Sequence, residues 1–150
     1  MTESILKALH ILGVVVWVGG MAFALMVLRP SLGVLEPPQR LALHGAVFTR
    51  FFRIVWHVMP IVLLTGYIML FGVYGGFGGV NAAVHLMHLL GLIMAAVFIY
   101  IVFSPWPALR TALETDDRAS AIVNLERIRK LIFLNLLLGL ATVVIAAFGP

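Results

Sequence analysis

Cysteine is absent from this chain of 150 residues. Its absence excludes disulfide bonds, cysteine-ligated iron–sulfur clusters and thiolate zinc sites. Charged residues are also scarce, at 11% of the chain, whereas an ordinary soluble domain has about a quarter. Hydrophobic residues make up 63%. Because a soluble fold of this size could not bury so much apolar surface, we expect lipid to surround the chain.

The few charges that exist avoid the apolar segments. No acidic residue lies inside an apolar run, which disfavours a proton pump built on membrane-buried carboxylates. The formal net charge is +4, but the basic residues lie between apolar runs, so we expect no nucleic-acid partner. No Walker, nucleotide-fold, serine-triad or HExxH pattern is present.

Four apolar runs dominate the sequence, each close to or above the roughly 20 residues that an α-helix needs to cross a bilayer. None shows the period-two polarity of a barrel strand. The runs predict an all-α fold, an integral membrane antiparallel four-helix transmembrane bundle that forms a single domain over residues 1–150. We place the spans at about 5–28, 54–74, 82–103 and 131–148. Proline at the start of Pro37-Pro38-Gln39 predicts a helix start, and we expect Asp116 or Asp117 to cap the helix that leads into the last span.

Basic residues give the expected orientation. Nine of the ten lie in the first and third connections, and the positive-inside rule places those connections in the cytoplasm. We therefore expect a multi-pass protein of a bacterial inner (cytoplasmic) membrane with both termini in the periplasm. The first run is long enough to span, so we do not expect a signal peptide.

Three histidines lie near the predicted outer ends of two spans that run parallel. His10-Ile11-Leu12-Gly13 and His88-Leu89-Leu90-Gly91 are near-identical segments, and His85 precedes the second by one turn. Ionisable side chains at membrane depth are costly, so such residues point to a functional site. Histidine is the commonest axial ligand of haem iron. We therefore predict a metal site between spans one and three with His10 and His88 as ligands and His85 as the substitute.

The preferred interpretation is a b-type haem protein that transfers electrons. Gly13, Trp17 and Gly91 share helical faces with the histidines, and the small residues would let a flat macrocycle approach. A haem near the outer surface could exchange electrons with a quinone or a periplasmic redox partner, as a membrane oxidoreductase does. Because four short helices barely enclose a porphyrin, we also consider a homodimer.

Two alternatives stay open for these histidines. Imidazole and thioether ligands suit copper, and Met21 and Met87 are candidate thioethers for a copper binding or transport protein. The histidines could instead only hydrogen-bond and tighten packing in a structural subunit.

A second polar set lies near the predicted cytoplasmic side. Arg50, Arg53 and His57 share one helical stripe. Arg50 and Arg53 could contact haem propionates or lipid phosphates, or the whole set could simply anchor the helix at the interface. His57 has no clear role, and we expect His44 to be an interfacial side chain outside any site.

These motifs resemble the CopD-like and HemJ-like membrane proteins. The resemblance rests on Lys7-x-x-His10 with Trp17, Gly19-Gly20 and Arg29-Pro30, on Thr65-Gly66, and on Asn135 with Gly139. It implies a small helical membrane protein that binds haem b or handles copper, with His10 as the histidine of the first helix.

HemJ-like relatives are protoporphyrinogen oxidases, which adds a third alternative function. They carry a lysine at the start of the third span and a Glu and Pro after the asparagine of the fourth span. This chain has His85-Leu86-Met87-His88 at the first place and lacks both residues at the second. The departures favour haem ligation by two histidines over that oxidase activity.

Overall fold

The structure is a computed structural model that describes residues 1–148, and it is helical almost throughout. In chain order the elements are α1 (Thr2–Ala22), a π-helical turn (Phe23–Leu28), α2 (Arg29–Ser31), a 3-10 turn (Leu32–Val34), α3 (Pro37–Gly72), a second 3-10 turn (Phe77–Gly79), α4 (Ala82–Phe103), α5 (Pro105–Glu114) and α6 (Arg118–Phe148). No strand occurs in the described residues. The predicted all-α class is confirmed.

Four helical segments are long and apolar enough to cross a membrane. They cover Thr2–Val34, Pro37–Gly72, Ala82–Glu114 and Arg118–Phe148. Many large apolar side chains on them face outward, including Leu12, Leu64 and Phe133, which are 60%, 61% and 55% exposed. Such a surface suits hydrocarbon rather than water, so the chain is a multi-pass protein of a lipid bilayer.

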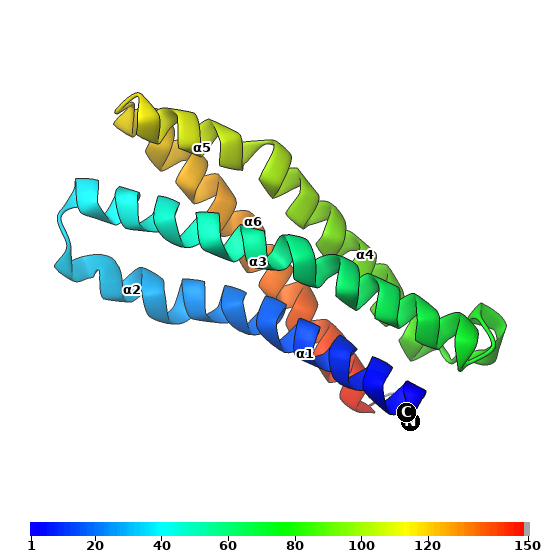
Figure 1. The fold of residues 1–150 in the computed structure, drawn as a ribbon. Coiled ribbons are helices and arrows are strands. Elements are labelled where there is room, and N and C mark those ends of the chain that lie inside the picture. Colours follow the sequence, from blue (N-terminus) through cyan, green and yellow to red (C-terminus); the bar gives the residue numbers. More distant parts are fainter. Residues whose placement is uncertain (149–150) are drawn as a thin grey trace.

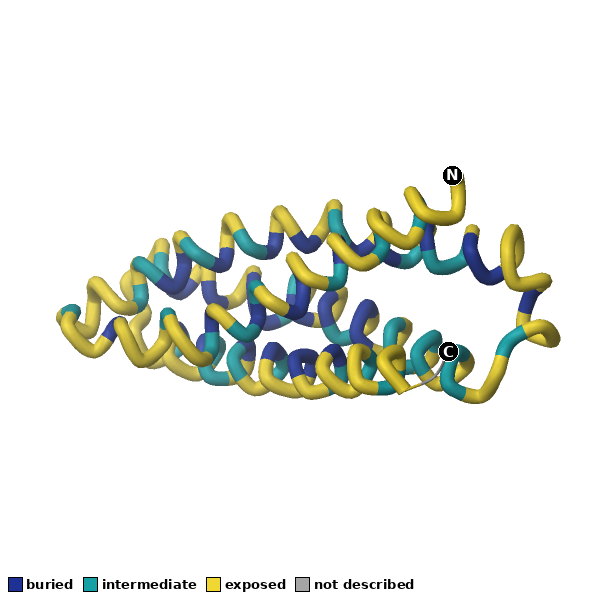
Figure 2. Tube along the Cα trace, turned by 90° about the horizontal axis from the view of Figure 1, so that it is seen from below, coloured by how far each residue is buried: buried dark blue, intermediate teal, exposed yellow. Residues whose placement is uncertain are grey.

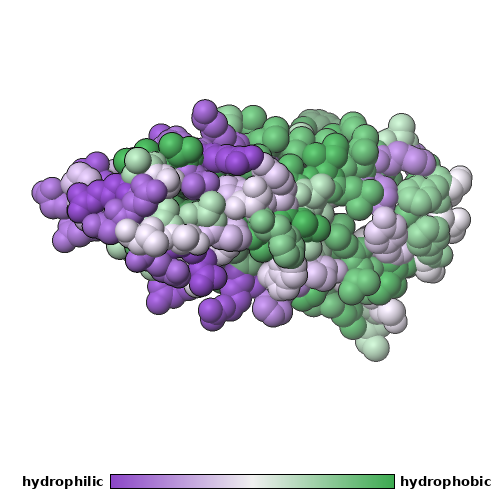
Figure 3. Space-filling model, turned by 90° about the horizontal axis from the view of Figure 1, so that it is seen from above, coloured by the Kyte–Doolittle hydropathy of each residue, from purple (hydrophilic) through white to green (hydrophobic). Residues whose placement is uncertain are grey.

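The long helices form an antiparallel bundle (Figure 1). α1 packs mainly on α3, α4 and α5 pack on α6, and α1 also touches α6. Trp17 of α1 and Phe98 of α4 meet edge to face in the core, with ring centres 6.2 Å apart. The start of α1 and the end of α6 lie at one end of the bundle, and the two basic connections lie at the other. Figure 3 shows hydrophilic residues gathered at that second end.

The buried core occupies only part of the bundle's length. We call residues 14–59 and 94–136 the basic half, and residues 1–13, 60–93 and 137–148 the histidine half. All members of the main hydrophobic cluster belong to the basic half, among them Trp17, Phe52, Phe98 and Ile128. In the histidine half the described buried apolar side chains are Val62, Met69 and Leu70. Along each helix, buried positions alternate with exposed ones (Figure 2).

Helix ends agree with the prediction where a local signal sets them. α4 spans residues 82–103 as predicted. Glu36 and Gln39 form a capping box at the start of α3, with Pro37 at its first position. The Oδ1 atom of Asp117 accepts a hydrogen bond of 3.1 Å from the Ser120 amide at the start of α6. These caps satisfy amide groups that a helix start leaves free.

The first span does not end at Arg29-Pro30, where the sequence predicts a stop. The helical path continues to Val34. The preceding turn is π-helical, and the amide of Arg29 donates to the carbonyl of Ala24, five residues earlier. The wider turn accommodates Pro30, which has no amide hydrogen to donate. α3 and α6 begin at Pro37 and Arg118, well before the apolar runs that they contain, as the predicted helix start and cap indicate.

The connection between α3 and α4 is built from glycine. Gly75 and Gly76 have φ angles of 73° and 83°, in the left-handed region that favours glycine. This tight turn brings Phe77 back toward the start of α4, where the Oδ1 atom of Asn81 accepts from the amide of Val84 at 3.1 Å. The loop thereby brings an aromatic ring beside His85 and His88.

Candidate metal-binding site

His10 rests on α3 through a specific set of contacts. Its Nδ1–H donates to the carbonyl of Val62 at 3.0 Å and to Oγ1 of Thr65 at 3.1 Å. The Thr65 hydroxyl in turn donates to the carbonyl of Ile61 at 2.7 Å. A methyl group at Gly66 would lie 3.3 Å from Cε1 of His10. The glycine therefore lets the imidazole lie close to the α3 backbone.

These contacts fix the chemistry of the His10 ring. A carbonyl oxygen can only accept, so the neutral imidazole carries its hydrogen on Nδ1 and keeps a lone pair on Nε2. Histidines that bind metals commonly donate their second ring N–H to a backbone carbonyl in this way. Within residues 1–148, Nε2 has no hydrogen-bond partner of its own. His10 is therefore prepared to ligate a metal through Nε2.

His88 lies in an aromatic setting beside α3. Its Nε2 atom is 3.3 Å from the hydroxyl of Tyr67, a hydrogen-bond contact. Its ring meets the rings of Tyr67 and Phe77 edge to face, with centres 5.1 and 5.2 Å apart. The imidazole of His88 is thus engaged by α3 and by the glycine-rich loop.

His85 is exposed at the start of α4. Its Nδ1–H donates to the carbonyl of Asn81 at 2.9 Å, which leaves a lone pair on Nε2. The ring lies 5.8 Å from that of Phe77. His85 therefore presents a ligating nitrogen at the outer margin of the histidine half.

His10 and His88 contact neighbouring residues of α3 from two different helices, His10 at residues 62–66 and His88 at Tyr67. The Trp17–Phe98 contact gives a common depth reference. His10 precedes Trp17 by seven residues and His88 precedes Phe98 by ten, which places them about 10 and about 15 Å beyond that contact along the axis. The two depths differ by about 5 Å, and joint ligation of one metal stays a prediction.

The three histidines do not converge into one closed site. Among the described residues, no group of three or more histidine, cysteine, aspartate or glutamate side chains is placed to hold a metal ion. Each histidine instead makes its own contact with α3, the loop or its own helix.

The small and aromatic residues predicted around the histidines have different surroundings. A methyl group at Gly13 would lie only 2.5 Å from Val62, so this glycine allows close packing of α1 on α3. Trp17 is buried in the core against Phe98. A methyl group at Gly91 would meet no heavy atom within 4 Å, so this glycine faces open space. Of the two glycines, Gly91 is thus the one that leaves room beside its helix.

Arg50, Arg53 and His57 lie in the basic half, away from His10. The nine residues from Arg53 to Val62 correspond to about 14 Å along the helix. His57 is exposed, and its Nδ1–H donates to the carbonyl of Arg53 at 2.7 Å. These residues therefore form a separate group near the middle of α3.

Thr65, Gly66 and Tyr67 belong to the site although the sequence did not predict them as site residues. Thr65 is 5% exposed despite its hydroxyl group. The available signal is the Thr-Gly-Tyr segment itself, which interrupts an otherwise apolar run. Asn135 is a further buried polar residue, and its Nδ2 donates to the carbonyl of Met94 at 3.1 Å. This bond joins α6 to α4 in the core.

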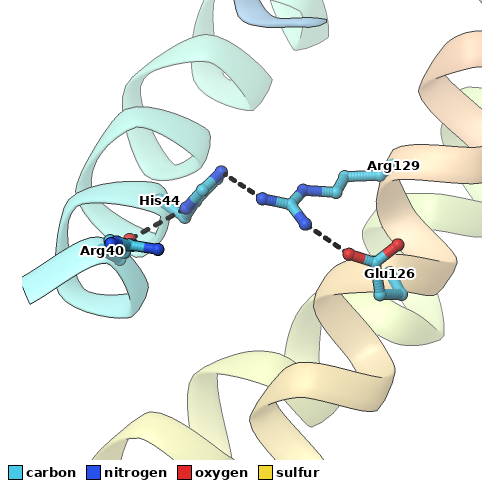
Figure 4. Close-up of polar contacts among 4 residues, drawn as sticks. All are labelled: Arg40, His44, Glu126 and Arg129. Atoms are coloured by element: carbon cyan, nitrogen blue, oxygen red, sulfur yellow. Dashed lines mark hydrogen bonds and ion pairs between the residues drawn. The ribbon is translucent and has the colours of Figure 1, made fainter. Parts of the chain in front are cut away.

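His44 is not the interfacial side chain that we expected. It is 4% exposed and forms a polar bridge between α3 and α6 (Figure 4). Its Nδ1–H donates to the carbonyl of Arg40 at 2.8 Å, and its Nε2 accepts from Nη2 of Arg129 at 3.1 Å. Arg129 also pairs with Glu126. The bridge gives a buried histidine two partners, which removes the cost of burying it alone.

Comparison with known families shows to which family the chain belongs. Residues 45–148 match the family described as Copper resistance protein D. The chain belongs to this family. No curated protein and no solved structure was found to match it. The match supports the CopD-like half of the resemblance and gives no support to the HemJ-like half.

The matched region of the Copper resistance protein D family includes much of the site. Thr65, Gly66, His85 and His88 lie inside it, whereas His10 lies on α1, before it. The structure joins the two parts, because His10 binds to Thr65 and packs on Gly66. The protein is thus a membrane protein of a family linked to copper resistance.

Proposed function

We propose that this protein binds copper ions within the membrane as its cargo and that His10 is the principal imidazole ligand. The observation that carries the proposal is the pair of hydrogen bonds from Nδ1 of His10 to Val62 and Thr65. They leave Nε2 as the donor atom, and imidazole nitrogen is a suitable ligand for copper. Membership of the Copper resistance protein D family supports the choice of metal.

Methionines add soft donors to the face of α3 that also carries Val62 and Gly66, two residues that His10 contacts. Met59 and Met69 are 8% and 9% exposed. Val62 and Gly66 lie between these two methionines in the sequence. The four residues are separated in turn by three, four and three positions, so all of them share one face of the helix. Thioether sulfur is a preferred ligand of Cu(I). A line of soft donors along one helix face suits an ion that passes along the helix.

The direct test is Cu(I) affinity of the full chain in detergent, measured by competition with a chromophoric Cu(I) chelator. We expect His10→Ala to abolish tight binding. We expect Thr65→Val, which removes one of the two acceptors of Nδ1–H, to weaken it about tenfold, at the lower end of the usual effect of such supporting residues. His57→Ala is the matched control and should bind as the wild type does. Unchanged affinity in His10→Ala would overturn the assignment.

A b-type haem is the second candidate. It is favoured by the parallel helices α1 and α4, which carry His10 and His88 at similar depth. The arrangement is not open for a porphyrin as it stands, because Nε2 of His88 contacts Tyr67 and the space at Gly13 is filled by Val62. Haem ligation therefore requires these contacts to separate. Electron transfer to a quinone or periplasmic partner, and a homodimer, stay predictions.

An absorption spectrum distinguishes the two candidates. The protein is purified after expression with ample haem, and spectra are recorded in air and after dithionite reduction. Reduced bands near about 560 and 530 nm would indicate low-spin haem b with two axial ligands. A colourless protein that binds Cu(I) supports copper handling and removes the haem candidate.

We also propose that the basic connections face the cytoplasm and that both termini face the periplasm of a bacterial inner membrane. Nine of the ten basic residues lie in the first and third connections, and hydrophilic residues gather at the end of the bundle that carries these connections (Figure 3). This distribution supports the orientation. The chain has no cysteine, so single cysteines report topology cleanly. A membrane-impermeant maleimide should label Gly78→Cys but not Glu114→Cys in spheroplasts, and the opposite pattern would reverse the orientation. A single domain over residues 1–150 remains part of this proposal.

A further inference from the structure

A hollow of about 220 Å³ lies between α3 and the junction of α4 with α5. α4 ends at Phe103, and α5 begins at Pro105 with a change of direction that is visible in Figure 1. Ser104 at the junction has φ and ψ angles of −122° and −81°, outside the helical region. The break turns α5 at an angle to α3 and opens the hollow, whose lining includes Thr49, Arg53, Trp56, Val102, Trp106 and Arg110.

Two arginines give the hollow a positive rim. Arg53 and Arg110 come from different helices, and both are exposed. The guanidinium group of Arg110 has one acidic contact, at 3.8 Å from Glu114. Within residues 1–148, the guanidinium group of Arg53 has no hydrogen-bond or ion-pair partner. Arginine pairs well with phosphate because its planar donors can contact two oxygens at once.

Aromatic rings give the same hollow an apolar floor and an apolar exit. Phe52 and Trp106 are buried and meet edge to face, with ring centres 5.3 Å apart. Trp56 is 44% exposed, and its ring is 6.1 Å from that of Phe103, which is 70% exposed. A strip of exposed aromatic surface thus runs from the arginines along the transmembrane part of the bundle.

We propose that this hollow binds the headgroup of an anionic phospholipid. Arg53 and Arg110 contact the phosphate, and one acyl chain follows Trp56 and Phe103. Tryptophan at the level of the headgroups is typical of a membrane–water interface, and Arg53 directly precedes the apolar run that begins at residue 54. A lipid fits better than a free phosphate ion because the exposed aromatic rings can contact an acyl chain, which a phosphate ion lacks. This site is separate from the copper site at His10.

The test is native mass spectrometry of the full chain in an uncharged detergent, with phosphatidylglycerol and phosphatidylcholine titrated in parallel. We expect the wild type to bind phosphatidylglycerol more tightly than phosphatidylcholine. Arg53→Gln with Arg110→Gln should lose about 30-fold in affinity for phosphatidylglycerol, since each arginine near a headgroup contributes about a factor of five. Arg53→Lys with Arg110→Lys keeps both charges and should recover part of the loss.

The matched control is Arg50→Gln, which removes an exposed arginine from the preceding turn of α3, outside the hollow. It should bind within about twofold of the wild type. Equal loss in Arg50→Gln would mean that diffuse positive charge attracts the lipid, and it would overturn the proposal. Wild-type affinity in the double glutamine variant would overturn it too. Displacement of the lipid by millimolar inorganic phosphate would instead identify the hollow as a site for a soluble anion.

Discussion

In the basic half, the rings of Trp17, Phe52 and Phe98 pack edge to face inside a continuous buried cluster. In the histidine half, Phe77 is 40% exposed although its ring lies beside those of His85 and His88, and Phe71 is 59% exposed. The difference indicates that the two halves of the bundle have different roles. The basic half has the packing that holds the helices in register, whereas the histidine half holds its imidazoles through a few hydrogen bonds. Regions with few buried contacts open most easily, which suits an ion-handling site.

The strongest way to test this contrast is to truncate one aromatic ring in each half. Phe98→Ala removes ring contacts with Trp17, Phe52 and Trp56. The resulting cavity should lower the free energy of unfolding by about 3–5 kcal/mol. Phe71→Ala, on the lipid-facing side of the histidine half, should cost less than about 1 kcal/mol. Unfolding by sodium dodecyl sulfate in mixed micelles, followed by circular dichroism, measures both. Equal losses would show that stability is evenly distributed.

The polar bridge of the basic half should have a smaller but measurable effect. Arg129→Gln leaves Nε2 of the buried His44 without its donor and Glu126 without its ion pair. We expect a loss of about 1–3 kcal/mol, the usual cost of a buried polar group that loses its partner. Lys130→Gln, at the neighbouring exposed position, should change stability by less than about 0.5 kcal/mol.

A double-mutant cycle shows whether the bridge acts as a pair. The double variant His44→Leu with Arg129→Gln should lose less free energy of unfolding than the two single variants together. The reason is that the second change removes a group whose partner the first change has already removed. Strict additivity would mean that the contact between His44 and Arg129 contributes nothing to the stability of the basic half.

Much of the fold was predictable because its signals are local. The apolar run over residues 82–103 predicts the bounds of α4 to the residue. Pro30 was misleading, since whether a proline ends a helix depends on the hydrogen bonds of the turn before it. That turn is π-helical here, a feature that sequence patterns do not reveal.

The histidines of the site were predictable from the sequence, but the residues that they contact were not. His10 and His88 were identified because a histidine at membrane depth is costly. Their contacts on α3 were not, because the sequence does not state which helix packs against α1. The contact between His10 and Thr65 joins residues that are 55 positions apart, and the bridge between His44 and Arg129 joins residues 85 positions apart. Partners at such separations are set by the packing of the helices, which periodicity along one helix cannot report.

The smallest predicted effect compares the helix caps of the two halves. Asp117 caps α6 in the basic half, and Asn81 caps α4 in the histidine half, each through a side-chain oxygen 3.1 Å from an amide nitrogen. The hydrogen bonds from Ser120 lower the pKa of Asp117 below its usual value. The cap therefore contributes fully above the pKa of an unfolded aspartate, about 3.9, and its contribution is lost as the pH falls through the lower folded pKa. The amide of Asn81 does not titrate.

Acid should therefore loosen the start of α6 and leave the start of α4 unchanged by this mechanism. Melting temperatures of the wild type and of Asp117→Asn, recorded between pH 6 and pH 3, isolate the effect, since every other titrating group is common to both proteins. We expect the wild type to lose slightly more stability than the variant over this range, by about 1–2 °C. Parallel curves would show that the charge of Asp117 adds nothing to a cap that asparagine can form equally well. In that case, the pH dependence of the basic half would have to come from groups inside the bundle rather than from its helix ends.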